Sequence, residues 1–171
     1  MILPKVRDPR FIAVRRGGTL SEANHQLLAT WAADCAAHVL HFFEKERPDD
    51  DRPRRAIDLG RAWAAGEVSW REARMAAFGA NAAAREASGA AREAAHAAGQ
   101  AGAVGHVAAH ELGAAAYAIR AVRAAAAPAE ALSAGRRECA WQRDQLPAEI
   151  RELVLDDERL RNKLCWFVFD C

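Results

Sequence analysis

The sequence has few of the motifs that identify small catalytic and metal-binding domains. Its four cysteines show no Cys-x-x-Cys spacing, which argues against a zinc ribbon and a thioredoxin-type site. Serines are few, and neither a G-x-S-x-G elbow nor a phosphate-binding glycine loop occurs. Nucleophilic catalysis by serine and P-loop nucleotide binding are therefore not expected.

An excess of charge of either sign is also missing. The chain has 24 Lys and Arg against 23 Asp and Glu, a formal net charge of +1 at pH 7. This balance gives no reason to expect non-specific binding to nucleic acid or to an anionic membrane. No charged segment followed by an apolar run begins at Met1, so we expect no secretory signal. The expected compartment is the cytoplasm, where the cysteines would stay reduced.

A membrane-spanning run is absent as well. Residues 97–118 are long enough to cross a bilayer, but they carry Gln100, His106, His110 and Glu111 on a background of Ala and Gly rather than Leu and Ile. We expect a buried helix of a soluble domain at this place.

Helical periodicity dominates what the sequence does contain. Apolar residues recur at steps of three, four and seven, as in Leu28, Trp31, Cys35 and Phe42, and no period-two pattern persists. A chain of 171 residues fits one domain with its own core. The prediction is an all-α, single-domain compact bundle of about six to seven helices over residues 19–171. Prolines and glycines in residues 1–18 favour an extended arm laid over that body.

Capping signals and prolines set the expected helix ends. Capping boxes at Thr19–Glu22 and Ser69–Glu72 each predict a helix start. The expected helices outside the centre cover residues 19–47, 51–66, 69–87, 128–145, 147–155 and 156–171. The apolar run at 165–169 is expected to dock onto the body, because its exposure would favour aggregation.

Residues 89–127 form an Ala- and Gly-rich central stretch that is expected to be one long helix or two collinear helices. Gly99, Gly102 and Gly105 each cost roughly 1 kcal/mol relative to Ala in a helix interior. Glycines this close together usually mean that another backbone comes near, and small side chains permit such close helix packing.

On a continuous helix the polar residues of this stretch would share a face. At about 100° per residue, His106, His110, Tyr117 and Arg120 fall within about a quarter-turn of one another. One interpretation is a ligand pocket. The other is a set of side chains that bond to each other across a helix interface, which is favoured because buried polar groups normally find partners.

Metal binding and histidine chemistry have weaker support. Glu111 follows His110, so the geometry of the H-E-x-x-H zinc motif is not reproduced. Cys35 and His38 lie one helical turn apart and could in principle form a thiolate nucleophile, but a buried cysteine acting as a small hydrophobe is favoured. We therefore expect no metal, no cofactor and no catalytic residue.

Two further stretches have the composition of binding surfaces. Arg7 and Arg10 lie on the arm, and Trp141 and Arg143 lie among hydrogen-bonding side chains. Each set can also be explained by arm anchoring or helix termination. Together with the four residues of the central stretch and His38, which lies on the apolar face of the first long helix, they make up the candidate ligand- or partner-binding residues.

A resemblance to one family extends over nearly the whole chain, carried by residues 2–44, 108–121 and 136–171. KVRDPRF (5–11), RRGGTL (15–20), AAHELGAAAYAIRA (108–121) and WQRDQLP (141–147) are similar to the immunity-protein-5-like family of bacteria. The resemblance implies an all-α cytosolic protein that neutralises a toxin, and it assigns no catalytic residue.

Three functions follow as hypotheses. The first is an immunity protein that sequesters a toxin by non-catalytic binding. The second is a small-molecule resistance protein whose pocket is lined by Trp and His. The third, with least support, is a His- or metal-dependent enzyme. The expected partner is a cognate toxin protein or a small-molecule toxin, with no nucleic acid and no membrane, and a homodimer is left open.

Overall fold

The computed structural model describes residues 3–171 and contains no β-strand within that range. It confirms the all-α prediction. The α-helices are α1 (Glu22–Val39), α2 (His41–Glu46), α3 (Arg52–Ala64), α4 (Trp70–Glu86), α5 (Gly89–Ala103), α6 (Glu111–Ala125), α7 (Ala131–Asp144) and α8 (Ala148–Arg161). Short 3-10 helices are η1 (Pro9–Phe11), η2 (Val14–Arg16) and η3 (Ala108–His110).

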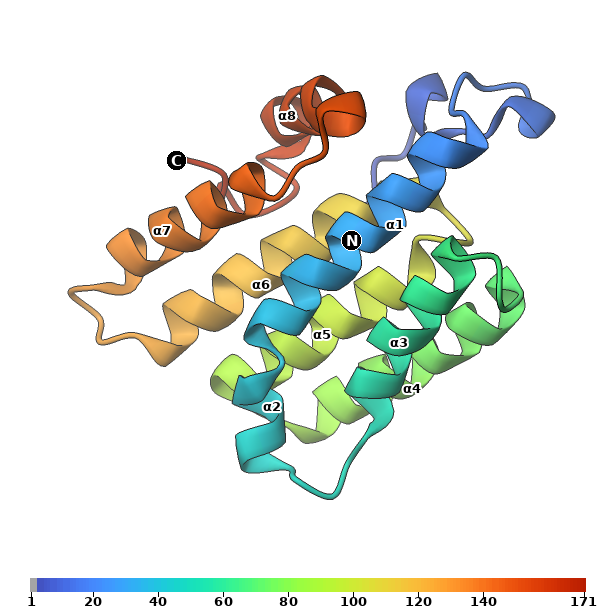
Figure 1. The fold of residues 1–171 in the computed structure, drawn as a ribbon. Helices are drawn as coiled ribbons and strands as arrows, with labels where there is room; N and C mark the ends of the chain where they lie inside the picture. The colour runs from blue at the N-terminus through green and yellow to red at the C-terminus, as the bar shows by residue number, and fades with distance from the viewer. Residues whose placement is uncertain (1–2) are drawn as a thin grey trace.

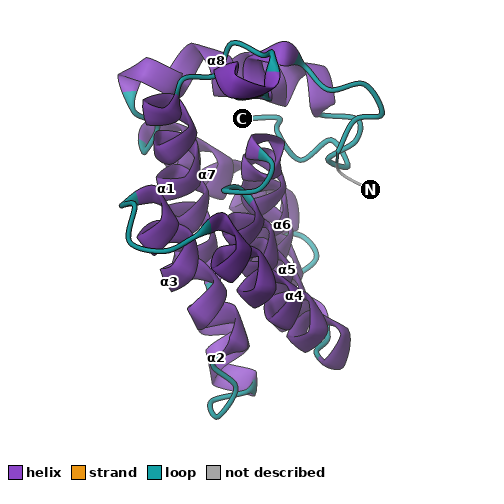
Figure 2. Cartoon of the chain, turned by 90° about the vertical axis from the view of Figure 1, so that its right-hand side faces the viewer, coloured by secondary structure: helices purple, strands orange, loops and turns teal. Residues whose placement is uncertain are grey.

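Helix α5 is the centre of the bundle. It packs against α1, α2, α3, α4 and α6, and α6 in turn packs against α1, α7 and α8 (Figure 1). Helix α8 crosses one end of the bundle, and α2 lies at the opposite end (Figure 2). The predicted helix over 19–47 is divided at Leu40 into α1 and α2.

The central stretch is two antiparallel helices, so the expectation of one helix or two collinear ones is wrong. The chain turns at residues 104–110, and α6 returns alongside α5. Partners across the hairpin are Gln100 with Gly113, His96 with Tyr117 and Glu93 with Arg120. Doubling back lets two Ala-rich helices bury their small side chains against each other, which a straight helix could not do.

A glycine at the end of α5 confirms the expected close backbone approach. A Cβ added to Gly102 would lie 3.0 Å from the Ala56 carbonyl oxygen of α3 and 3.2 Å from the Ala73 carbonyl oxygen of α4. Gly105 differs, because its neighbour is a side chain. A Cβ added to Gly105 would lie 2.6 Å from a ring carbon of Trp63. The first of these glycines therefore brings three helices together.

The N-terminal arm is not extended. Among its described residues it forms η1 and η2 and folds back so that the Thr19 amide donates to the Pro9 carbonyl at 3.0 Å. Phe11 is buried against the body. The cap of α1 is Ser21, which accepts from the Asn24 amide at 3.2 Å, rather than Thr19. The capping box predicted at Ser69–Glu72 is confirmed.

The C-terminal region differs from the prediction in its helix boundaries. Residues 147–155 and 156–171 were expected as two helices, but α8 runs continuously from Ala148 to Arg161 and is followed by turns. The apolar run docks only in part, because Cys165, Val168 and Phe169 are buried. Trp166 and Phe167 are exposed, and both have a positive φ, 56° and 55°.

A disulfide between Cys139 and Cys171 ties the end of the chain to α7. The expectation that all four cysteines are free thiols is therefore wrong for this pair, while Cys35 and Cys165 are free and buried. Spacing along the sequence could not show this, because 32 residues separate the two cysteines. Within residues 3–171, no helix combines the length and the apolar character needed to span a membrane.

Candidate functional site

The four residues expected to share one helix face lie in different environments. His106 is in the turn after α5, His110 ends η3, and Tyr117 and Arg120 are on α6. The expected continuous face does not exist, because the chain reverses direction between Val104 and His110. Tyr117 and Arg120 belong to an aromatic cluster. His110 bonds to an amide side chain, and His106 lies under the N-terminal arm.

The aromatic cluster is built around Arg120. Its Nε lies 3.0 Å from the Glu93 carboxylate of α5, and its guanidinium carbon lies 4.0 Å from the ring centroid of Trp166. Tyr117 meets Trp166 edge to face at 5.2 Å and stacks on His96 at 4.9 Å. Arg120 therefore compensates a buried carboxylate and fixes the C-terminal tail against α5 and α6.

His110 is a neutral side chain that links η3 to α5. Its Nδ1 lies 2.8 Å from Oε1 of Gln100. Burial, with smaller effects from the neighbouring His106 and Arg161, lowers the pKa of His110 to about 4. The uncharged ring donates its Nδ1 proton to the Gln100 oxygen. Gly113 makes room for this pair, because a Cβ there would lie 2.5 Å from Oε1 of Gln100.

His96 is held by the same kind of bond. Its Nδ1 lies 3.0 Å from Oδ1 of Asn81, whose amide donates to the Ala77 carbonyl at 2.9 Å. Desolvation lowers the pKa of His96. Both histidines thus bond across a helix interface through amide side chains, and a ligand-binding role for this region stays a prediction.

His106 lies beneath the arm, stacked on Trp70 with ring centroids 5.1 Å apart. Desolvation lowers its pKa, and the nearby arginines Arg74, Arg16 and Arg7 act in the same direction. The hollow beside it has a volume of only about 30 Å³. Small-molecule pockets are typically about 300–1,000 Å³. As folded, this site accommodates little more than one water molecule.

His38 and Trp141 are brought together by the fold, although they lie on separate helices, α1 and α7. Their rings stack at 3.7 Å with an interplanar angle of 15°. Nδ1 of His38 lies 2.9 Å from the buried carboxylate of Glu138. Gln142 donates to the same carboxylate at 3.0 Å and accepts from the Trp31 indole at 2.9 Å. The His38 ring is therefore oriented by a fixed network while part of its edge stays exposed.

Two of the candidate arginines are engaged within the molecule. Arg143 donates to the Glu158 carboxylate at 2.8 Å and to the Cys171 carbonyl at 2.6 Å. Arg10 pairs with Asp8 at 2.7 Å and Asp156 at 2.8 Å. Arg7 is exposed on the arm. Arg10 anchors the arm to α8, which is the alternative that the sequence had left open for it. Arg143 links Cys171 to α8.

Sequence reasoning missed the buried ion network that joins α6 to α8. Arg161 donates to Glu111 at 3.2 Å and to the Ala109 carbonyl at 3.0 Å, and it also pairs with Asp157. Glu111 is fully buried, and burial raises its pKa while Arg161 opposes that rise. A signal was present, because Ile150, Val154, Asp157 and Arg161 follow the core-facing spacing of α8.

Two further features of the site residues are the spacing of possible metal ligands and the burial of the Cys35 thiol. Within residues 3–171, no three His, Cys, Asp or Glu side chains lie close enough to hold a metal ion. Cys35 is fully buried, and burial raises the pKa of its thiol well above the usual value. A thiol in this environment is a weak nucleophile, because the reactive form is the thiolate.

Comparison with known proteins gives one match. A family model described as "Imm-5 like putative immunity protein" matches residues 18–149. The matched range contains the AAHELGAAAYAIRA and WQRDQLP segments, and it leaves out KVRDPRF and the C-terminal tail. No curated protein and no solved structure matches the chain.

Proposed function

The chain belongs to the Imm-5 like family of putative immunity proteins, and from this membership we propose that it protects its host by binding and sequestering a cognate toxin, without chemical turnover. The observation that carries the proposal is the family match over residues 18–149, which includes α1 through α7. The family description supplies the immunity role, and the non-catalytic mechanism is our inference.

The internal pairing of charged groups supports sequestration. Glu93, Glu111, Glu138 and Glu158 are buried, and each has a cationic or amide partner on another segment or on the next turn. Such networks hold helices in one arrangement. A rigid body of this kind presents a preformed surface, and preformed surfaces lose little conformational entropy on binding.

The test is a protection assay followed by analysis of the complex. Cells that express a candidate toxin from the same genome are grown with and without the chain. Protection is expected, together with a stoichiometric complex on size-exclusion chromatography. Toxin released from that complex should have its unmodified intact mass and its full activity. Protection with covalently altered toxin would show an enzyme instead, and the absence of protection would refute the immunity role.

The small-molecule alternative loses support at His106, where the hollow is about 30 Å³. A second hollow, lined by residues that include His25 and Trp63, has a volume of about 350 Å³, which is within the range of small-molecule pockets. A ligand-dependent change in tryptophan fluorescence that is lost in His110→Ala would favour it over sequestration.

We also propose that the protein acts in the cytoplasm, where a toxin entering the cell would be met. The Cys139–Cys171 disulfide counts against a reducing compartment. Rapid alkylation of thiols in intact cells, followed by mass spectrometry, measures the state of this pair. A fully oxidised pair in the cell would contradict a cytoplasmic location.

A further inference from the structure

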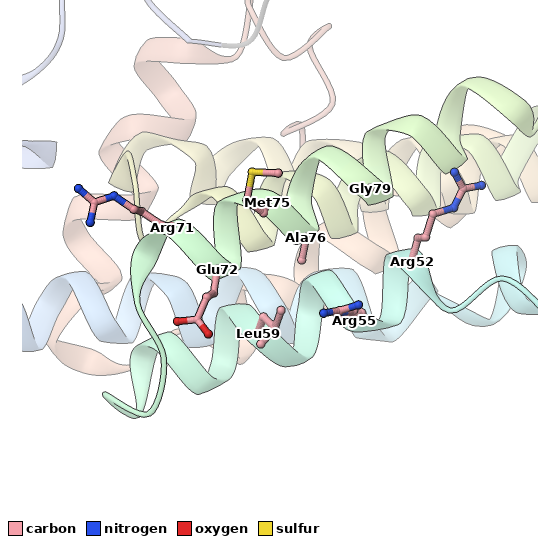
Figure 3. A pocket seen from close by; sticks show the side chains of 8 residues that line it. All are labelled: Arg52, Arg55, Leu59, Arg71, Glu72, Met75, Ala76 and Gly79. Carbon is pink, nitrogen blue, oxygen red and sulfur yellow. The ribbon is translucent and has the colours of Figure 1, made fainter.

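A groove runs between α3 and α4 on the side of the bundle away from α7. It has a volume of about 460 Å³ and is open to solvent along its length. Figure 3 shows Arg71 and Arg52 at its opposite ends, with Leu59, Met75 and Ala76 between them. The other lining residues are Arg55, Glu72 and Gly79.

Two large apolar side chains of α4 are exposed at this surface. Met75 is 63% exposed and Phe78, one turn further along α4, is 49% exposed. Large apolar side chains that gather on one helix face beside a groove are typical of protein-binding sites. Methionine is common at such sites, because its flexible side chain adapts to the partner.

Two of the three arginines that line the groove are not neutralised. Within residues 3–171, Arg55, Arg71, Arg74 and Arg85 have no carboxylate within ion-pair distance. The third lining arginine, Arg52, pairs with Asp50 and Glu86. Outside the groove, Arg54 of α3 pairs with Glu44 and Arg61 pairs with Asp34. Of the four unpaired arginines, Arg55 and Arg71 line the groove and give it a positive surface.

Two of these guanidinium groups are held in place by aromatic rings. Arg71 lies over Trp70 at 4.9 Å, and Arg74 lies over Phe78 at 4.7 Å. Stacking on a ring leaves the N–H groups in the guanidinium plane free to bind a carboxylate. Glu72 is the acidic residue among those that line the groove. Its carboxylate accepts hydrogen bonds from the Ser69 amide and hydroxyl, both at 2.8 Å. Asp58 on α3 is exposed and is the one acidic residue of that helix.

We propose that this groove is where the toxin binds, through a segment that carries an apolar side chain flanked by carboxylates. The apolar side chain would cover Met75 and Leu59, and the carboxylates would pair with Arg71 at one end and with Arg55, which lies between Leu59 and Arg52 (Figure 3). The arrangement rests on the proposed immunity function and assigns its binding surface. It lies wholly within the residues matched by the family model. Exposed apolar residues between the arginines favour a protein over a nucleic acid, whose backbone would need only the charge.

The test compares charge reversal in the groove with charge reversal elsewhere. Arg71→Glu is expected to weaken binding of the toxin identified in the protection assay by roughly tenfold to a hundredfold. Arg137→Glu is the matched control, because Arg137 is exposed on α7, outside the groove; it should leave the dissociation constant within about twofold. Met75→Ser tests the apolar contact separately. Circular dichroism and thermal unfolding establish that each variant is folded.

The possible outcomes distinguish a wrong groove assignment from a wrong immunity function. Restored affinity between Arg71→Glu and a toxin variant with one Asp or Glu changed to Arg would confirm the contact. If the wild-type chain binds and neutralises toxin but Arg71→Glu and Met75→Ser bind equally well, the groove assignment is wrong and the immunity function stands. If the wild-type chain fails to bind toxin, the function itself fails. Self-association lost in Met75→Ser, or binding of a 20-base-pair DNA duplex lost in Arg71→Glu, would overturn the assignment in favour of a second copy or a nucleic acid.

Discussion

At the scale of single residues, burial keeps most of the histidines uncharged. Desolvation is the largest cause of a lowered pKa at His25, His96, His106 and His110, and only for His110 is the shift large, to about 4. Such a group binds a proton more readily in the unfolded chain, where the pKa is about 6.5. Protonation therefore favours unfolding.

His110 should accordingly make the protein sensitive to acid. Its contribution to stability is fully present above pH 6.5 and is lost as the pH falls toward 4, by about 3 kcal/mol in total. His110→Asn keeps an N–H donor for Gln100 but cannot be protonated. We expect urea unfolding of this variant to depend less on pH between 6.5 and 4.

The control is His41→Asn, because His41 is exposed and bonds only to the His38 carbonyl, at 3.1 Å. This variant should keep the pH dependence of the wild type. An unchanged pH dependence in His110→Asn would show that His110 is accessible to protons in the folded state.

Arg161 is the residue whose loss should cost most stability. It is 5% exposed, and its removal would leave Glu111 and Asp157 as buried carboxylates without a cation. Arg161→Leu should lower the free energy of unfolding by about 3–5 kcal/mol, since breaking a buried pair leaves an uncompensated charge. Denaturant titration at pH 7 measures this loss.

Arg159→Leu provides the comparison from the same helix. Arg159 is exposed and pairs with Asp156 at 2.6 Å near the surface, where such pairs contribute about 0–1 kcal/mol. Equal losses in the two variants would mean that the network of Arg161 is solvated.

At the scale of helices, the packing depends on how closely α5 approaches its neighbours. The Ala and Gly side chains of α5 let it contact five other helices. Little side-chain volume separates the backbones, so the contacts are sensitive to a single methyl group at the crossing point of α3, α4 and α5.

Gly102→Ala tests this sensitivity. The added methyl group would lie 3.0 Å from the Ala56 carbonyl oxygen and 3.2 Å from that of Ala73. We expect a loss of about 1–3 kcal/mol, because both neighbours are backbone atoms that cannot rotate away. Gly79→Ala on α4 is the matched control, since the added methyl group would lie 3.9 Å from Cβ of Arg52, and it should gain up to about 1 kcal/mol from helix propensity. Thermal unfolding of the two variants should therefore shift in opposite directions.

At the scale of the whole molecule, the N-terminal arm and the C-terminal residue are both fixed to the same helix. Arg10 of the arm pairs with Asp156 of α8, and the C-terminal carbonyl of Cys171 accepts from Arg143, which also binds Glu158 of α8. The disulfide to Cys139 closes the C-terminal end. These links hold α8 across the end of the bundle, as seen in Figure 2.

Loss of the disulfide should destabilise this assembly as a unit. Cys171→Ser is expected to lower the free energy of unfolding by about 2–4 kcal/mol, through the greater entropy of the unfolded chain. Reduced wild-type protein should match the variant, and the reductant should have no effect on the variant itself. A wild-type stability that does not respond to reductant would contradict a structural role for the bond.

The sequence by itself determined the helical class, the approximate ends of α3, α4 and α7, and the close approach at Gly102. These features depend on periodicity, prolines, caps and side-chain size, all of which act over a few residues. The same local rules failed where the chain reverses at Val104–His110, because Ala- and Gly-rich segments fit a straight helix and a hairpin equally well.

Only the tertiary structure decided which polar residues meet. His38 with Trp141 joins α1 to α7, and Arg161 with Glu111 joins α8 to α6. Arg120 with Glu93 joins the two helices of the α5–α6 hairpin, whose reversal the sequence did not show. Arg55 and Arg71 of the α3–α4 groove are likewise unpaired because the fold places the carboxylates of the described residues beyond ion-pair distance from them. Pairing energies depend on distance and burial, and these are properties of the packed chain that no local pattern specifies.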